Sequence, residues 1–262
     1  MATKLHLDLD ATRGTNGGSF SWLFSPSAIS YYPVQASYAA QPAATSPIWI
    51  YYGTNHNGVH YSHEATIAPG TPATLRVLDP NKEYGYEINV QDTHLWKIYA
   101  SNQADSIFGA SSGVVNNDFI DAGGGSDTVK VDNSDIVYGG LGNDYITASD
   151  GNWINSQLST FGDPNGDPQF DNDTIIAQHK NYIDAGIGDD SIVAKSSDTI
   201  YAGDGNDQVH ASDHSYIDAG KGDDTVDFDG GAHHSTVIGG DGQDSLVAGE
   251  SDIVYGDGAT DT

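Results

Sequence analysis

Cysteine is absent from this sequence. Its absence excludes disulfide bonds and a catalytic thiol. If the protein works outside the cell, its rigidity must come from another source, and bound metal is the obvious substitute.

Basic residues are scarce. Lys and Arg together number 9 against 37 Asp and Glu, which gives a formal net charge of −28 at pH 7. A chain with this charge is repelled by nucleic acid phosphates and by anionic membrane surfaces. We therefore expect no nucleic-acid partner and no membrane insertion.

Long apolar runs are also missing. No stretch of about 18 apolar residues occurs, as a membrane-spanning helix would need, and residues 1–10 lack the apolar core of a cleaved signal peptide. Export by the general secretory route is therefore not expected. The GxSxG and HExxH motifs are absent as well, and we expect no enzymatic activity.

The sequence does contain a repeated six-residue motif that is rich in glycine and ends in Asp. Its copies are AGGGSD at 122–127, GGLGND at 139–144, AGIGDD at 185–190, AGDGND at 202–207, AGKGDD at 219–224 and GGDGQD at 239–244. Glycines at positions two and four allow positive φ and a close approach of carbonyl oxygens to an ion, and the Asp at position six supplies a carboxylate. The pattern is that of the calcium-binding nonapeptide G-G-x-G-x-D-x-U-x.

Two ladders of polar residues alternate along the chain, eight or nine residues apart, so that one coil has 17 residues and two turns. The strong ladder comprises Asp127, Asp144, Asp173, Asp190, Asp207, Asp224, Asp244 and Asp261, with Asp105 as a possible further member. The second ladder comprises Asp118, Asp135, Asn152, Asn181, Asp198, Ser215, Ser235 and Asp252. Longer steps predict insertions at roughly residues 156–170 and 230–232, both in turns, where a solenoid tolerates them.

An aliphatic residue follows each ladder position except the last by two residues. In the strong ladder these are Ile107, Val129, Ile146, Ile175, Ile192, Val209, Val226 and Leu246, and in the second ladder Ile120, Val137, Ile154, Ile183, Ile200, Ile217, Val237 and Val254. Such residues stack on their own copies in successive coils, which predicts a narrow core between two parallel sheets.

From residue 105 to residue 261 the sequence resembles the RTX family of secreted calcium-binding proteins, whose repeats fold as a right-handed parallel β-roll. The resemblance implies calcium between successive turns of one edge, held by position-six carboxylates and turn carbonyls, and about five to seven ions in all. It also implies one-step (type I) export from a Gram-negative bacterium, with folding outside the cell at extracellular calcium concentrations.

Carried onto this sequence, the resemblance indicates a set of calcium ligands in the glycine-rich turns. The carboxylates are Asp127, Asp144, Asp173, Asp190, Asp207, Asp224 and Asp244; the turn residues are Gly123, Gly125, Gly140, Gly142, Asn143, Gly186, Gly188, Asp189, Gly203, Gly205, Asn206, Gly220, Gly222, Asp223, Gly240 and Gly242. The segment before Asp173 lacks glycine, which makes its site the least regular. An extra calcium loop at Asp163, Asn165, Asp167 and Asp171 is a further possibility.

The turns of the second ladder depart from the family pattern because they contain little glycine. We expect calcium along one edge only, and a second edge closed by side-chain hydrogen bonds of Asn, Ser and Asp. Occupancy of Asp135, Asp198 or Asp252 by calcium remains an alternative.

Residues 1–100 show no repeat and are expected to form a β-sandwich-like domain, followed by the roll at 101–262. The expected strands are 4–9, 19–24, 47–52, 59–65, 73–78, 84–90 and 94–100. This region is rich in aromatic residues, and Trp22, Trp49 and Tyr51 are candidate ligand-binding residues. An alternative is that the aromatics fill the core of the sandwich.

Residues next to the second ladder predict an outward, partly aromatic face on the roll. They are Phe119, Ile136, Trp153, Tyr182, Thr199, Tyr216, Thr236 and Ile253, with Tyr138, Tyr201 and Tyr255 nearby. An exposed apolar stripe of this kind usually marks a contact surface, and Trp153 is a candidate ligand-binding residue.

These features favour a secreted, non-enzymatic surface or adhesin-type protein with a calcium-folded β-roll. Its partner would be a glycan or a protein at a surface. Two alternatives stay open: a self-assembling subunit of a surface layer or filament, and an accessory module of an exported polysaccharide- or protein-modifying enzyme.

Overall fold

The computed structural model describes residues 5–10, 20–21, 34–37, 46–53, 61–67, 73–77, 86–90, 96–100, 104–108, 117–157, 171–228, 234–257 and 261–262. All regular structure in these ranges is β, as predicted, and none of it is a helix that could cross a membrane. The chain divides into two compact units, residues 1–135 and 136–262.

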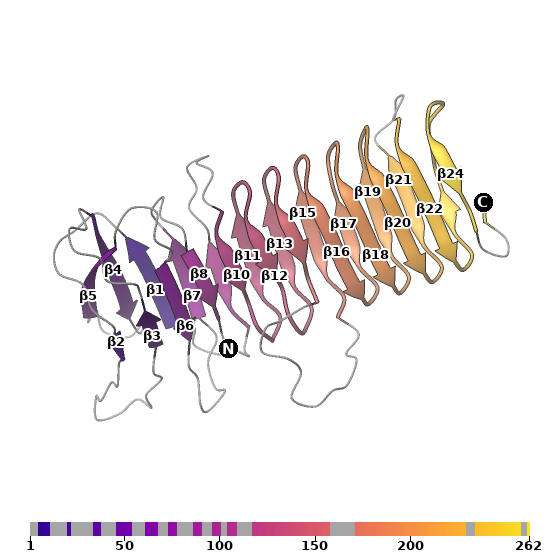
Figure 1. The fold of residues 1–262 in the computed structure, drawn as a ribbon. Coiled ribbons are helices and arrows are strands. Elements are labelled where there is room, and N and C mark those ends of the chain that lie inside the picture. Colours follow the sequence, from indigo (N-terminus) through magenta and orange to yellow (C-terminus); the bar gives the residue numbers. More distant parts are fainter. Residues whose placement is uncertain are drawn as a thin grey trace. The chain divides into compact units, whose positions relative to one another are not determined.

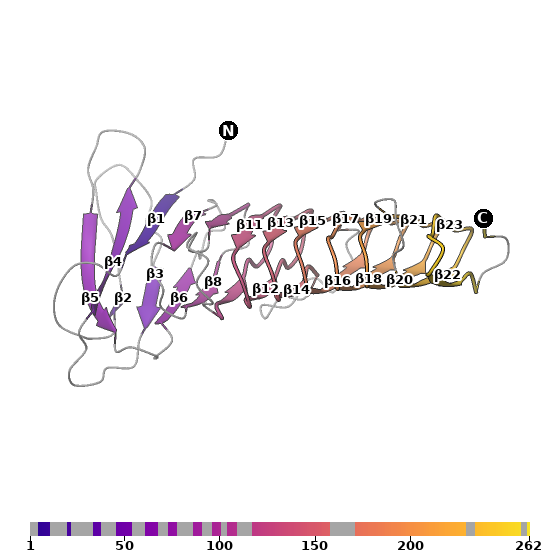
Figure 2. The same cartoon turned by 90° about the horizontal axis from the view of Figure 1, so that it is seen from above.

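The second unit is a parallel coil of two sheets, which form two layers (Figures 1 and 2). One layer, the even sheet, contains β12 (Ile136–Tyr138), β14 (Trp153–Asn155), β16 (Tyr182–Ile187), β18 (Thr199–Asp204), β20 (Tyr216–Lys221), β22 (Thr236–Asp241) and β24 (Ile253–Tyr255). The other layer, the odd sheet, contains β13 (Tyr145–Ala148), β15 (Thr174–Ala177), β17 (Ser191–Val193), β19 (Gln208–Ala211), β21 (Thr225–Phe228) and β23 (Ser245–Leu246).

Each strand of the coil pairs in parallel with the strand one coil later, so that equivalent residues lie opposite each other. Ile183 is opposite Ile200, and Ile200 is opposite Ile217. This register places every residue of the repeat beside its own copies at the strand spacing of about 4.8 Å.

The core of the second unit is made of the predicted aliphatic residues. The buried members are Val137, Ile146, Ile154, Ile175, Ile183, Ile192, Ile200, Val209, Ile217, Val226 and Val237. Leu246 is half-buried and Val254 is exposed, because β23 and β24 are the last described strands of their sheets.

The first unit also consists of two sheets, in agreement with the sandwich-like prediction. Its strands are β1 (Leu5–Asp10), β2 (Phe20–Ser21), β3 (Val34–Ser37), β4 (Ser46–Gly53), β5 (Tyr61–Ile67), β6 (Ala73–Val77), β7 (Tyr86–Val90), β8 (Trp96–Tyr99), β9 (Ser106–Phe108), β10 (Phe119–Asp121) and β11 (Thr128–Val131). Sequence reasoning missed β3, which is short and antiparallel to β6.

Parallel pairing in the first unit begins before residue 101. One sheet of this unit has the order β11-β9-β7-β1-β4-β5, in which β1, β7, β9 and β11 are parallel and β4 and β5 are antiparallel. In the other sheet, β6, β8 and β10 are parallel. β6, β7 and β8 show no sequence repeat, but they therefore pair in parallel as the repeat strands of this unit do.

Replacing a stacked core residue tests the fold. We expect Ile200→Ala on β18 to lower the free energy of unfolding by about 2–5 kcal/mol, because Ile200 is fully buried and the neighbouring coils cannot collapse onto the cavity. Thr199→Ala, which changes the adjacent outer face, should shift this free energy by no more than about 0.5 kcal/mol. Urea denaturation in saturating calcium measures both, and equal effects would contradict the assignment of inner and outer faces.

Candidate metal centre

The glycine-rich motifs of the second unit lie in turns that lead from the even sheet to the odd sheet, which we call the glycine edge. Its turns are residues 139–144, 185–190, 202–207, 219–224 and 239–244. The described residues 156–157 and 171–173, on either side of the insertion, belong to one more, which we call the insertion turn. Turns that lead back to the even sheet contain the second ladder and form the second edge. In the first unit, the 122–127 turn joins β10 to β11 in the same way.

Most Asp residues of the strong ladder use one carboxylate oxygen to link two coils. The Asp190 backbone N–H donates to Asp207 Oδ1 at 2.8 Å, and the Asp207 N–H donates to Asp224 Oδ1 at 2.8 Å. The same bond joins Asp144 to Asp173, Asp173 to Asp190, Asp224 to Asp244 and, in the first unit, Asp105 to Asp127. These carboxylates are buried, with at most 2% of each residue exposed.

In five of these residues the second carboxylate oxygen is buried and accepts no hydrogen bond. They are Asp173, Asp190, Asp207, Asp224 and Asp244. A buried oxygen of an ionised carboxylate without a donor is costly, whereas oxygen is the ligand atom that calcium prefers. The donor set therefore fits a hard divalent cation at this edge.

Turn glycines supply the other oxygens. All twelve predicted glycines at positions two and four have φ between 99° and 151°. A Cβ at Gly203 would overlap the carbonyl oxygen of Gly186, and one at Gly205 would overlap that of Gly188. Glycine is therefore required at these positions, because carbonyl oxygens of one coil lie directly against the backbone of the next.

Burial raises the pKa of the ladder carboxyls well above their ordinary value of 3.8. The pKa reaches about 7 for Asp173 and Asp207, about 8 for Asp190 and about 6 for Asp224. Neighbouring carboxylates of the same edge raise these values further. A cation between the coils would offset both effects.

Position-five side chains form a separate, exposed ladder that runs in the opposite direction. The Asn206 N–H donates to Asp189 Oδ1, and the Asp223 N–H donates to Asn206 Oδ1, both at 2.8 Å. Asn143 accepts in the same way from Asn172. One side-chain oxygen of each of four predicted ligands thus accepts a backbone N–H of a neighbouring coil. These ligands are Asn143, Asp189, Asn206 and Asp223.

The second edge is closed by side-chain hydrogen bonds, as predicted. The Asn152 N–H donates to Asn181 Oδ1 at 2.8 Å, and the Asn181 N–H donates to Asp198 Oδ1 at 2.6 Å. The Ser215 N–H donates to Ser235 Oγ, and the Ser235 N–H donates to Asp252 Oδ1. Asn152, Asn181, Ser215 and Ser235 are neutral, so their turns have no ladder charge to balance. Asp198 differs, because its Oδ2 is buried and accepts no hydrogen bond, and calcium at this residue stays an alternative prediction.

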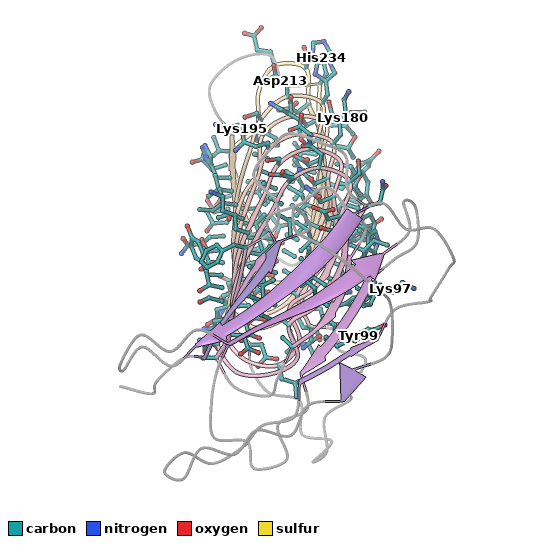
Figure 3. The ribbon with its side chains drawn as sticks, turned by 90° about the vertical axis from the view of Figure 1, so that its left-hand side faces the viewer. Lys97, Tyr99, Lys180, Lys195, Asp213 and His234 are labelled. Carbon is teal, nitrogen blue, oxygen red and sulfur yellow. The ribbon has the colours of Figure 1, made fainter. Side chains whose placement is uncertain are left out.

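A single residue with positive φ precedes every second-ladder member except Asp252, which explains why these turns need little glycine. These residues are Asn117, Ser134, Gly151, Lys180, Ser197, His214 and His234, with φ between 51° and 72°. This is the left-handed region that non-glycine residues can adopt at a cost, whereas φ above 99° at two positions per turn demands glycine. Figure 3 shows Lys180, Lys195, Asp213 and His234 together at this edge.

The insertion turn keeps the ladder intact. Asp144 pairs with Asp173 across 29 residues instead of 17, and Asp173 pairs with Asp190 across 17. Asp173 is therefore in register although the turn lacks the usual glycines. Asp171 is buried two residues earlier. The sequence indicates it as a ligand of an extra calcium loop, but not as a member of the repeat; Asp163, Asn165 and Asp167 of that loop lie outside the described residues.

Aromatic side chains on the outer face of the even sheet form a continuous row over five strands. Successive ring centroids of Tyr138, Trp153, Tyr182, Tyr201 and Tyr216 are 5.2–5.9 Å apart. The Trp153 ring stacks on Tyr182 with an interplanar angle of 4°, so one of its faces is covered. The side chains of Trp22, Trp49 and Tyr51 lie outside the described residues.

Among the residues that the structure describes, no three or more His, Asp or Glu side chains converge on one point. An ion at the glycine edge would accordingly be held by few carboxylates and completed by backbone carbonyls. Coordination of this mixed kind suits calcium, which accepts six to eight oxygen ligands in flexible geometry.

A model of the RTX calcium-binding nonapeptide repeat matches four segments of the chain, residues 115–130, 131–152, 194–213 and 212–232. They contain the turns 122–127, 139–144, 202–207 and 219–224. Repeats of this type bind calcium. No curated protein and no solved structure matches the chain significantly.

The variant Asp207→Asn tests the two oxygens of a ladder carboxylate separately. The amide keeps Oδ1 for the Asp190 N–H but replaces Oδ2 by an NH2 group, which cannot bind a cation. We expect the calcium concentration at half-maximal folding to rise about tenfold, because ligand charge tunes affinity. Asp213→Asn at the second edge removes the same charge and should leave this midpoint unchanged; a matching rise would assign the effect to net charge alone. Circular dichroism during a calcium titration measures both variants.

Acid should favour the metal-free coil. The folded carboxyls have pKa values of about 6–8 against an ordinary 3.8, so the folded state binds more protons between these values. The stability that protonation provides is complete below about pH 4 and is lost as the pH rises through 6–8. Protein desalted free of metal should therefore gain β signal in circular dichroism as the pH falls from 8 to 4. A gain of β signal on raising the pH would contradict this account.

Proposed function

This chain is an RTX calcium-binding repeat protein, and from that premise we propose that it is a secreted, non-enzymatic scaffold of adhesin type. Calcium at the glycine edge folds the coil outside the cell. The folded protein then acts at a cell surface, where it binds a glycan or a protein.

The observation that carries this proposal is the row of buried Oδ2 atoms without hydrogen-bond partners at Asp173, Asp190, Asp207, Asp224 and Asp244. Ligands that repeat at every coil make the ion part of the fold. Binding free energy then becomes folding free energy, since the unfolded chain has no such site.

Charge supports a role outside the cell. At a net charge of −28, stacked carboxylates about 4.8 Å apart repel each other in the absence of a cation. The chain would then stay unfolded at low cytosolic calcium and fold at about 10⁻⁴–10⁻³ M, the range to which extracellular calcium modules are tuned. RTX repeat proteins are typically secreted by Gram-negative bacteria.

Exposed apolar side chains favour a second candidate function, self-association. Val247, Ile253, Val254 and Tyr255 are 42–59% exposed on and next to the last described strands, where apolar side chains could contact a second copy. Calcium-dependent assembly into sheets or filaments would follow, whereas a monomer at all calcium concentrations would exclude it.

Calcium titration tests the proposed function. We expect β structure, followed by circular dichroism, to form as calcium rises through about 10⁻⁴–10⁻³ M, and light scattering to report whether the folded chain is monomeric. Full β structure in metal-free protein at pH 7 would refute calcium-driven folding.

A binding experiment tests the adhesin role separately from folding. Binding to a glycan array or to intact cells should require calcium, and Trp22→Ala or Trp49→Ala should weaken it without changing the calcium midpoint of folding. Calcium-independent binding, or no binding to any surface, would contradict the adhesin role.

A further inference from the structure

The insertion turn has an aspartate where the other turns have their position-four glycine. The Asp171 N–H donates to the Ile187 carbonyl at 3.1 Å, as the Gly188 N–H donates to the Asp204 carbonyl at 2.9 Å one coil later. A Cβ at Gly188 would overlap the Asp171 carbonyl oxygen, as one at Gly205 would overlap that of Gly188. Asp171 therefore occupies position four in both hydrogen bonding and backbone contact.

The side chain of Asp171 is directed into the space between two turns of the glycine edge. Its carboxylate accepts a hydrogen bond from the N–H of Gly142, the position-four glycine of the preceding coil. Asp171 is only 2% exposed, and its Oδ2 has no hydrogen-bond partner. An unpartnered carboxylate oxygen at this depth requires a cation or a proton.

Position two of the same turn also has an oxygen-bearing side chain. The residue paired with Gly186 in the preceding coil is Gln157, and a Cβ at Gly186 would lie 2.7 Å from Gln157 Oε1. In each following coil, the carbonyl oxygen of the position-two glycine lies at the equivalent place, against the position-two glycine of the next coil. The amide oxygen of Gln157 is thus a hard ligand in the position of a turn carbonyl.

This turn has two buried carboxylates, Asp171 and Asp173, whereas in the next turn Asp190 is buried and Asp189 is exposed. Burial is the main cause that raises the pKa of Asp173 and of Asp190, and the charge of Asp171 raises both further. Lys180 and Lys195, from the same part of the coil, lie at the second edge (Figure 3). Their positions leave the balancing of Asp171 and Asp173 to a bound cation.

We propose that the insertion turn holds a calcium site of its own kind, in which the carboxylates of Asp171 and Asp173 both bind the ion and backbone carbonyls complete its coordination. The site deepens the proposed function, since it rests on calcium binding at the glycine edge. It differs from the glycine turns because two buried carboxylates come from one turn, and Asp171 and Asp173 lie between the matched segments 131–152 and 194–213.

Two carboxylates in one turn give this site a higher ligand charge, and higher ligand charge means tighter calcium binding. The insertion turn therefore fills at lower calcium than the glycine turns do. Folding of the second unit begins there and spreads to both neighbours, because each coil contacts only the coils beside it.

Calorimetric calcium titration of the full chain tests the site. We expect the wild-type protein to show one tight step before the remaining ions bind, and Asp171→Asn to weaken that step about tenfold or more. Asp171→Gly, which restores the residue usual at position four, should fold in saturating calcium and also lack the tight step. Asp213→Asn, the charge-matched control at the second edge, should keep it.

The possible failures are distinguishable. An unchanged first step in both Asp171 variants, or tighter binding in Asp171→Gly, overturns the insertion-turn site while leaving calcium binding by the glycine turns intact. If the wild-type protein binds no calcium and Asp207→Asn changes nothing, the proposed function itself fails. If Asp213→Asn also lacks the tight binding step, the step depends on net charge alone, and the proposal is overturned.

Discussion

Stacking like charges at the spacing of a parallel sheet is the constraint on which the rest of this coil depends. A repeat that places Asp at the same position of every turn brings carboxylates to about 4.8 Å from one another, inside a buried edge. One oxygen of each carboxylate satisfies a backbone N–H of the preceding coil, and that bond fixes the register. The other oxygen, at Asp173, Asp190, Asp207, Asp224 and Asp244, is buried without a hydrogen-bond partner and is of the ligand type that calcium prefers.

The two edges of the coil differ in the residues that accept the inter-coil hydrogen bonds and in their backbone conformation. At the second edge, Asn181 and Ser235 accept the inter-coil N–H with neutral oxygens, and one left-handed residue per turn is enough. At the glycine edge, two residues per turn have φ values that only glycine tolerates, which brings carbonyl oxygens close together. Buried carboxylates without a second hydrogen bond are therefore frequent at the glycine edge, whereas Asp198 is such a residue at the second edge.

Features that repeat every 17 residues could be predicted from the sequence. They are the two ladders, the stacked core and the hydrogen bonds that close the second edge. Asp171 could not be assigned in this way, because the insertion before it hides the alignment until Asp173 is seen to pair with both neighbours. β3 has no repeat and only four residues, and the continuation of parallel pairing to β6 and β7 rests on contacts far apart in sequence.

The outer aromatic row shows how metal at one edge can control a surface elsewhere on the coil. Tyr138, Trp153, Tyr182, Tyr201 and Tyr216 come from five strands and contact one another only because the coils stack in register. Trp153 and Tyr182 stack with nearly parallel rings whose centroids are 5.8 Å apart, which is the offset arrangement that aromatic pairs prefer. Any partner that reads this row reads several coils at once. Its binding would therefore depend on the register of the stacked coils and not on one strand alone.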